Sequence, residues 1–258
     1  MEGLNFREMG SGPTVILIHG FPFNQQIWKE FADKLSDSLH VVTVDLPGFG
    51  KSALPADGFT LDDIARTLLS WQEARNYKKP VIVGHSLGGY VALAMAEQQP
   101  DRIGGICLFH STALPDSEEK KASRNKTLDF IARQGVRAFT SSFVGQLYAD
   151  PQHRSITQVK NIAVQASAES VTGYTRAMRE RPDRRPVLEN YPGPILLLAG
   201  EKDPGIPADT ILDQASLNPR AEAVILPDTA HMGMFECEAS CLKKIAQFVS
   251  KSAVTIAP

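Results

Sequence analysis

A single serine, Ser86, stands between glycines in the segment Gly84-His85-Ser86-Leu87-Gly88. An apolar, β-branched run precedes it and an apolar run with a helical pattern follows, so we expect a strand that turns sharply into a helix. This context fits the G-x-S-x-G nucleophile elbow, a turn so tight that side chains two positions from the serine would clash. The segment therefore predicts a serine that is lifted above the strand ends to attack an electrophile.

A serine hydroxyl is a weak nucleophile until a base takes its proton, and six histidines are candidates for that base. We favour His231, because it follows the last apolar strand in a loop that reaches the edge where the strands end. His85 adjoins the serine, but successive side chains diverge at a tight turn, which indicates a structural role. The other four flank strands or lie in a helical stretch: His19, His40, His110 and His153.

An orienting carboxylate must hold the imidazole in the tautomer that accepts the serine proton. Asp203 follows an apolar strand in a turn at the same expected edge of the sheet. Glu201 and Asp228 lie in comparable turns and are alternatives on residue type alone. The tetrahedral oxyanion also needs hydrogen-bond donors, and the Leu87 backbone N–H at the start of the helix is expected to be one.

The elements that must position these residues follow a regular pattern. Six apolar, β-rich runs alternate with helical patterns, which predicts an α/β fold with a mostly parallel central sheet flanked by helices. Alternating polarity over residues 4–8 predicts an additional antiparallel edge strand. The six runs are 14–18, 41–44, 81–83, 105–109, 195–199 and 223–226.

Residues 112–190 interrupt this alternation, since they show successive helical patterns and no convincing strand. The acidic segment 116–119 predicts the start of a first helix and Gly135 its end. A helical insertion that follows a strand most often covers a site at the strand ends. We therefore expect a helical cap at 112–190 on a core domain made of 1–111 and 191–258.

Together these motifs resemble those of the α/β-hydrolase fold superfamily, in its cap-bearing serine hydrolase or esterase type. The resemblance covers nearly the whole chain and implies that Ser86, Asp203 and His231 form a catalytic triad, in the chain order of that family. It also implies that the Phe21 backbone N–H is the second oxyanion donor. The segments that carry it are 19–22, 45–52, 84–89, 200–203 and 230–232.

The resemblance implies a serine hydrolase that cleaves a small carboxylic ester or related acyl bond through an acyl-enzyme on Ser86. His231 would be general base and acid, and Asp203 the orienting acid. C–C bond hydrolases, lactonases, thioesterases and perhydrolases with the same triad are alternatives, as is a small-molecule receptor on this fold. Candidates for an apolar substrate pocket are Phe21, Phe23, Trp28 and Met232.

The amino-acid composition excludes several classes of binding partner. The 258 residues carry a formal net charge of −2 and no polybasic run, which argues against a nucleic-acid partner or an acidic lipid surface. No apolar stretch approaches the ~20 residues of a membrane span. Because the N-terminal segment is polar and unlike a signal peptide, we expect a cytoplasmic protein that acts on a small-molecule substrate.

No cofactor or metal is expected. The segment 48–52 ends like a phosphate-binding loop, but that motif requires a glycine where Asp45 stands. Cys107 lies in an apolar run and is expected to pack as a small hydrophobic residue. Cys237 and Cys241 are four residues apart on a predicted helix, without the further His or Cys ligands that a zinc site requires.

Overall fold

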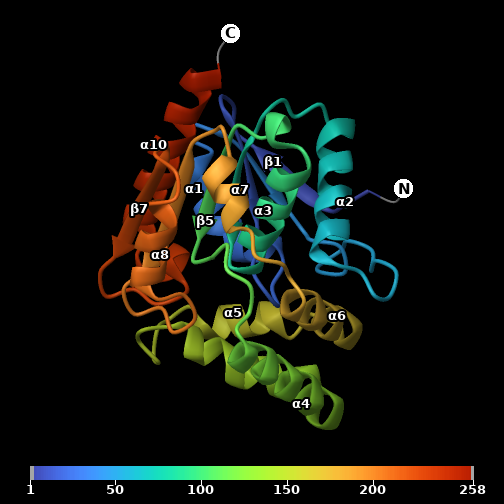
Figure 1. The fold of residues 1–258 in the computed structure, drawn as a ribbon. Helices are drawn as coiled ribbons and strands as arrows, with labels where there is room; N and C mark the ends of the chain where they lie inside the picture. Colours follow the sequence, from blue (N-terminus) through green and yellow to red (C-terminus); the bar gives the residue numbers. More distant parts are fainter. Residues whose placement is uncertain (1–2, 257–258) are drawn as a thin grey trace.

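A seven-stranded sheet forms the centre of the computed structural model, which describes residues 3–256 (Figure 1). The strand order is β1-β3-β2-β4-β5-β6-β7; β1 pairs antiparallel with β3, and all other neighbours are parallel. The predicted mostly parallel sheet and its antiparallel edge strand are both confirmed. The strands are β1 (Phe6–Met9), β2 (Thr14–Ile18), β3 (His40–Val44), β4 (Val81–His85), β5 (Gly105–Phe109), β6 (Ile195–Gly200) and β7 (Ala221–Leu226).

Helices cover both faces of the sheet because the inner strands are apolar on both sides. Successive residues of β2 alternate between two buried apolar clusters, one on each face. Side chains of α2 and α3 complete one cluster, and those of α1 and α10 complete the other. These helices are α1 (Lys29–Leu35), α2 (Leu61–Ala74), α3 (Leu87–Gln98) and α10 (Glu238–Ile256).

The chain between β5 and β6 is helical, as predicted. In Figure 1, α4, α5 and α6 lie together beyond one end of the sheet, whereas α7 lies beside α3. The Leu188 side chain of α7 belongs to the same apolar cluster as α3, so the last helix of the predicted insertion covers the sheet itself. The elements are α4 (Glu118–Phe143), η3 (Val144–Leu147), α5 (Ile156–Ala163), α6 (Ala168–Arg179) and α7 (Arg185–Asn190).

Helical geometry stops at Gly135, as predicted, and the element labelled α4 consists of two helical segments that meet there. Gly135 has φ 80° and ψ 166°, which kinks the helix, and α4 continues to Phe143. A glycine tolerates this positive φ, and helical geometry resumes on its far side. Gly135 therefore divides α4 into two arms with different directions.

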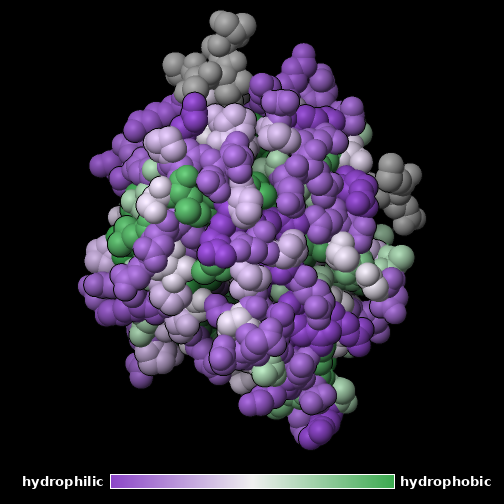
Figure 2. Space-filling model, viewed as in Figure 1, coloured by the Kyte–Doolittle hydropathy of each residue, from purple (hydrophilic) through white to green (hydrophobic). Residues whose placement is uncertain are grey.

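Shorter helices complete the fold, and none of them changes the layering. Figure 2 shows that hydrophilic residues cover most of the visible face. Within residues 3–256, no helix combines the length and the apolar character that crossing a bilayer requires. The short elements are η1 (Gln25–Trp28), η2 (Pro100–Arg102), α8 (Ala208–Ala215) and α9 (Gly233–Glu236).

Candidate active site

Ser86 occupies the turn between β4 and α3 in a backbone conformation that side chains rarely adopt, with φ 51° and ψ −113°. The neighbouring chain fixes this conformation. The Ser86 N–H donates to the Phe109 carbonyl at 2.9 Å, and the Ser86 carbonyl accepts from Ser111 Oγ at 2.7 Å. Strain of this kind persists where surrounding structure enforces it, and it clusters at functional sites.

The two glycines of the motif are required for steric reasons. A Cβ on Gly84 would lie 2.3 Å from the Gly88 backbone, and a Cβ on Gly88 would lie 2.4 Å from the Ile18 carbonyl oxygen. Neither contact can be relieved by moving a flexible side chain. Any side chain at either glycine would therefore clash with backbone atoms, as the sequence motif predicts.

His231 and Asp203 form a buried hydrogen-bonded pair. His231 Nδ1 lies 2.7 Å from Asp203 Oδ2, and Asp203 Oδ1 accepts the backbone N–H groups of Gly205 and Ile206 at 2.9 and 3.0 Å. Burial alone would raise the pKa of Asp203, but His231 and the hydrogen bond from His110 outweigh it and hold this pKa well below its ordinary value. Asp203 is thus a carboxylate that fixes a proton on His231 Nδ1.

The other ring nitrogen, His231 Nε2, is then left to act as base. Ser86 and His231 line the same cavity, although no hydrogen bond links Ser86 Oγ to His231 among residues 3–256. Such contacts are often long in unliganded enzymes and shorten when substrate binds. The His231 backbone N–H donates to the Leu147 carbonyl at 2.9 Å, which ties the histidine loop to η3.

The alternative acids lie in exposed turns. Asp228 forms an ion pair with Lys202 at 2.6 Å, and its backbone N–H donates to Glu201 Oε2 at 3.2 Å. Glu201 and Asp228 are exposed, and neither forms a hydrogen bond or ion pair with the His231 ring among the described residues. The geometry therefore separates Asp203 from its two rivals, which residue type alone could not do.

His110 also contacts Asp203, a role that its place in the sequence did not predict. Its Nδ1 lies 3.1 Å from Asp203 Oδ2, the oxygen that His231 contacts. The Gly200 backbone N–H approaches the same nitrogen at 3.3 Å, but the closer carboxylate requires a proton there. The available signal was its position at the end of β5, because parallel strands end at the same edge of the sheet.

His85, which was expected to be structural, and His19 are both buried and hydrogen-bonded to backbone groups. His85 Nε2 lies 2.9 Å from the His231 carbonyl oxygen, and burial is the main cause that lowers the pKa of His85 well below its ordinary value. His19 Nδ1 lies 2.9 Å from the Gly20 carbonyl oxygen, and its Nε2 accepts the Leu46 N–H at 3.0 Å. Burial lowers the pKa of His19 to about 4. Both rings are therefore neutral, and their hydrogen bonds hold the backbone at Gly20, Leu46 and His231 in place.

Two backbone donors are available for an oxyanion. Leu87 is the first residue of α3, so its N–H has no partner within the helix. The Phe21 N–H finds no acceptor in the part of the chain that the structure describes. Both residues flank Ser86 in space, since Leu87 follows it in the chain and the Phe21 side chain lines the same cavity.

A cavity of about 420 Å³ opens above Ser86. Its walls come from the two arms of α4, from η3, and from the turns that carry Asp203 and His231. The apolar and aromatic residues that line it, which are the kind that line substrate pockets, are Phe21, Tyr90, Phe139, Phe143, Leu147 and Ile206.

Three of the predicted pocket residues do not line this cavity. Phe23, Trp28 and Met232 are 1%, 0% and 0% exposed and belong to the apolar cluster beneath the sheet. Trp28 stacks on Phe109, with ring centroids 6.1 Å apart. The assignment of these three side chains to the pocket is therefore wrong, because their loops turn them into the core, while Phe21 does reach the cavity.

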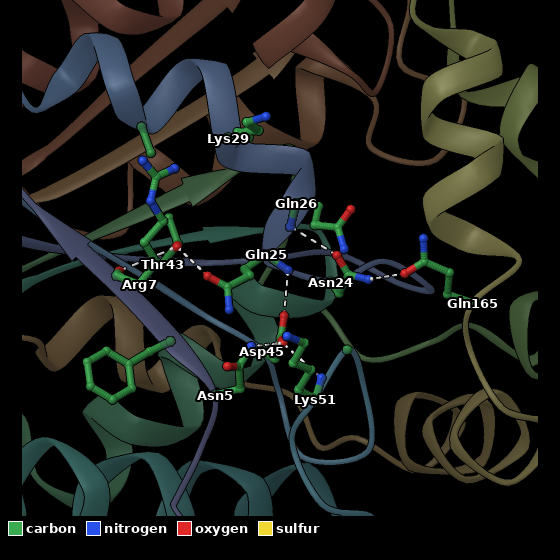
Figure 3. A pocket seen from close by; sticks show the side chains of 13 residues that line it. Asn5, Arg7, Asn24, Gln25, Gln26, Lys29, Thr43, Asp45, Lys51 and Gln165 are labelled. Carbon is green, nitrogen blue, oxygen red and sulfur yellow. Dashed lines mark hydrogen bonds between the residues drawn. The ribbon is translucent and has the colours of Figure 1, made fainter.

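A second, polar hollow of about 380 Å³ is lined in part by Asn24 and Gln25, which follow β2 in the chain (Figure 3). Asp45 stands at its centre and accepts from Asn5 Nδ2, the Gln25 N–H and the Lys51 N–H at 2.6, 2.8 and 3.0 Å. These bonds hold together three segments of the chain, which contain Asn5, Gln25 and Lys51. The residues lining this hollow do not include Ser86 or His231, so we interpret it as a structural joint.

The trio His110, Asp203 and His231 is also the cluster whose ligand atoms lie close enough for a metal ion, among the described residues. Metal–ligand distances of ~2.0–2.2 Å need space between the ligand atoms. Here the two imidazoles already contact the carboxylate at hydrogen-bond distances of 3.1 and 2.7 Å. We therefore interpret the trio as a hydrogen-bond network.

Of the cysteines, Cys107 packs in the core as expected, and Cys241 is buried beside Gly233.

Comparison with known proteins identifies relatives over almost the whole chain. The family model described as "Alpha/beta hydrolase family" matches residues 15–240. A pimeloyl-[acyl-carrier protein] methyl ester esterase of Vibrio cholerae is 29% identical and covers 96% of this chain and 98% of its own. A dihydrolipoyllysine-residue acetyltransferase component of an acetoin cleaving system from Pseudomonas putida is 28% identical over 96% of this chain and 67% of its own length.

Among solved structures, a thermophilic esterase from Thermogutta terrifontis, solved with malate bound, superimposes with a TM-score of 0.90. It is 30% identical, and the match covers 96% of this chain and 93% of that one.

Proposed function

This chain belongs to the α/β hydrolase family, and we propose that it is a serine hydrolase that cleaves small carboxylic esters through an acyl-enzyme on Ser86. The observation that carries the proposal is the buried Asp203–His231 pair, whose free imidazole nitrogen shares a cavity with the strained serine. Family membership confirms the predicted fold. Two relatives named as esterases support an ester as the bond that is cleaved.

In the first step, Ser86 Oγ attacks the ester carbonyl while His231 Nε2 takes the serine proton. Asp203 stabilises the imidazolium that forms, since its carboxylate stays ionised beside it. The backbone N–H groups of Leu87 and Phe21 donate to the oxyanion of the tetrahedral intermediate. Loss of one such donor typically costs roughly 3–4 kcal/mol of transition-state stabilisation.

The intermediate collapses when His231 protonates the departing alcohol, which leaves an acyl group on Ser86. A water molecule enters after the alcohol has gone, and His231 takes one of its protons as it attacks the acyl carbonyl. When the second tetrahedral intermediate collapses, the bond to Ser86 Oγ breaks, the acid is released, and the His231 imidazolium gives its proton to Ser86 Oγ. Each step uses the same base and the same oxyanion donors, so no cofactor is part of this mechanism.

We further propose that α4, η3, α5 and α6 act as a cap. Both arms of α4 line the cavity above Ser86, and the hydrogen bond from the His231 N–H to the Leu147 carbonyl joins η3 to the catalytic loop. A cap in this position excludes water from the site, which strengthens the electrostatic interactions inside it.

The proposal is tested by intact-mass measurement after treatment with a fluorophosphonate. We expect one adduct on the native protein, none on Ser86→Ala, and a much slower reaction of His231→Ala. Ser142→Ala is the matched control, because Ser142 also lines the cavity but donates its hydroxyl to the Phe139 carbonyl at 2.9 Å. Labelling that persists in Ser86→Ala, or no labelling of folded native protein, would contradict the proposal.

A further inference from the structure

The cavity above Ser86 has two chemically different walls. The apolar wall contains Phe21, which contacts Phe139 and Phe143 with ring centroids 6.2 Å away in both cases. A second, polar wall comes from the first arm of α4, and its members recur at three- and four-residue spacing, so they share one face of the helix. These residues are Lys120, Ser123, Arg124 and Thr127.

The polar wall carries an excess of positive charge. Asp116 is the one acidic residue that lines the cavity, among the described residues. Its carboxylate accepts from Arg124 Nε at 3.0 Å and from Arg181 Nη1 at 2.6 Å. The Asp116 side chain is fully buried, and although burial would raise its pKa, the two arginines outweigh it and lower this pKa. One carboxylate is thus shared by two guanidiniums.

Lys120 has no acidic partner in the described part of the chain. Its Nζ donates to the Gly205 carbonyl at 3.0 Å, on the turn that also carries Asp203. This bond satisfies one of the three donors of the ammonium group. The Lys120 ammonium group therefore lies next to the turn that carries Asp203, and no carboxylate among the described residues forms an ion pair with it.

Arg124 is oriented in a way that leaves its terminal groups available. Asp116 engages only its Nε, and the two Nη groups have no protein acceptor among residues 3–256. Arg181, in contrast, is 3% exposed, donates to the Leu114 and Met178 carbonyls, and lies over the Tyr90 ring. Arg181 holds the wall together, and Arg124 presents a guanidinium fork of the kind that binds carboxylates.

From these observations we propose that Lys120 and Arg124 form an anion subsite, and that the preferred substrates are esters bearing a carboxylate away from the bond that is cleaved. This inference rests on the proposed esterase function and specifies its substrate class. The carboxylate can belong to the acyl part, as in a monoester of a dicarboxylic acid, or to the alcohol part. In either case the apolar wall contacts the remaining carbon chain.

The test compares matched ester pairs that differ in charge. Mono-p-nitrophenyl adipate and p-nitrophenyl heptanoate place a carboxylate or an alkyl end on the acyl part, and 4-carboxyphenyl and 4-isopropylphenyl butanoate do so on the alcohol part. For native protein we expect kcat/KM to favour the charged member of at least one pair by fivefold or more. The preference should decrease at high salt, because the ion pairs are partly exposed to solvent.

Variants of the subsite assign that preference to specific charges. Lys120→Met and Arg124→Met should each lower the charged-to-neutral ratio of kcat/KM at least fivefold, whereas Lys120→Arg should retain most of it. Lys121→Met is the matched control, because Lys121 lies on the same helix, pairs with Glu118 at 2.9 Å and does not line the cavity. It removes the same charge and should leave the ratio unchanged.

The outcomes separate the two proposals. Preference for adipate alone places the carboxylate on the acyl side, and preference for the carboxyphenyl ester alone places it on the alcohol side. Neutral esters preferred in both pairs, or a ratio that Lys120→Met and Arg124→Met do not change, would overturn the anion subsite while the esterase function stands. Failure to hydrolyse any ester, together with failure of Ser86 to react with a fluorophosphonate, would overturn both.

Discussion

His110 Nδ1 lies 3.1 Å from Asp203 Oδ2, although the two residues are 93 positions apart in the chain. This contact and that of His231 converge on one carboxylate oxygen. With its proton on Nδ1, His110 has a bare Nε2 that is buried without a partner among the described residues. Buried nitrogens are rarely left unpaired, so the Nδ1 contact with the carboxylate is the interaction that accounts for the orientation of the ring.

We expect His110→Phe to lower kcat/KM about tenfold, because Asp203 loses a hydrogen bond to a charged group. The Asp203 carboxylate would then be less stabilised by its surroundings and would interact more strongly with protonated His231. The acid limb of the pH profile of kcat/KM should therefore move to higher pH, and His110→Asn, which keeps an N–H donor, should move it less. A purely structural role for His110 would lower the active fraction in a fluorophosphonate titration and leave this limb in place.

Replacement of the orienting acid should have a larger effect. Asp203→Asn is expected to lower kcat by about 10⁴-fold, because an amide at this position favours the wrong imidazole tautomer. Glu201→Gln and Asp228→Asn are matched controls, since both remove a carboxylate from a neighbouring exposed turn. Steady-state kinetics on one ester compares the three variants. Activity of Asp203→Asn close to that of the controls would assign the acid to another residue.

The glycine before the serine is expected to be essential for the fold of the turn. Gly84→Ala would place a Cβ 2.3 Å from the Gly88 backbone, a clash that must move the start of α3. Overpacking of this kind typically costs ~1–3 kcal/mol, which lowers the melting temperature of a domain this large by roughly 2–12 °C. Gly145→Ala is the control, because an added Cβ there meets nothing within 4 Å. Equal melting temperatures for the two variants would show that the turn can relax.

The sequence sufficed for the sheet and for the turn that carries Ser86, because each depends on local pattern. Apolar runs define strands, and the requirement for small residues around Ser86 is satisfied within five positions. Asp203 and His231 follow from the rule that parallel strands end at one edge, since β6 and β7 are neighbours in the sheet. That rule also placed Glu201 and Asp228 at the same edge, so the structure was needed to separate them.

The rest depends on contacts that no local pattern encodes. His110 meets Asp203 because β5 and β6 are adjacent strands, although the whole helical insertion separates them in the chain. Trp28 and Met232 are apolar residues in segments that follow strands, and the sequence alone does not indicate that their side chains pack in the core. The kink at Gly135 likewise determines which residues of α4 reach the cavity.

Acid stability should depend on His19, which is fully buried and bridges the Gly20 carbonyl and the Leu46 N–H. Burial lowers its pKa to about 4 from the ordinary 6.5, so between these values the unfolded chain binds a proton that the folded chain does not. The free energy of unfolding must therefore fall as pH decreases from 6.5 to 4, by about 3 kcal/mol from this residue. Burial also lowers the pKa of His85 and His110, which adds to the effect in the same direction. Asp203, whose pKa is lowered from 3.8, contributes only below this window.

Urea denaturation between pH 7 and pH 4 measures this dependence directly. His19→Gln retains a side chain that can donate and accept hydrogen bonds but does not titrate, so its stability should decline less steeply over this range than that of the native protein. His153→Gln serves as the control, because it makes the same substitution at a histidine that is only partly buried. Since the slope is compared and not the absolute stability, a general loss of stability in His19→Gln does not affect the result. A slope in His19→Gln equal to the native one would mean that His19 is not a source of the acid sensitivity.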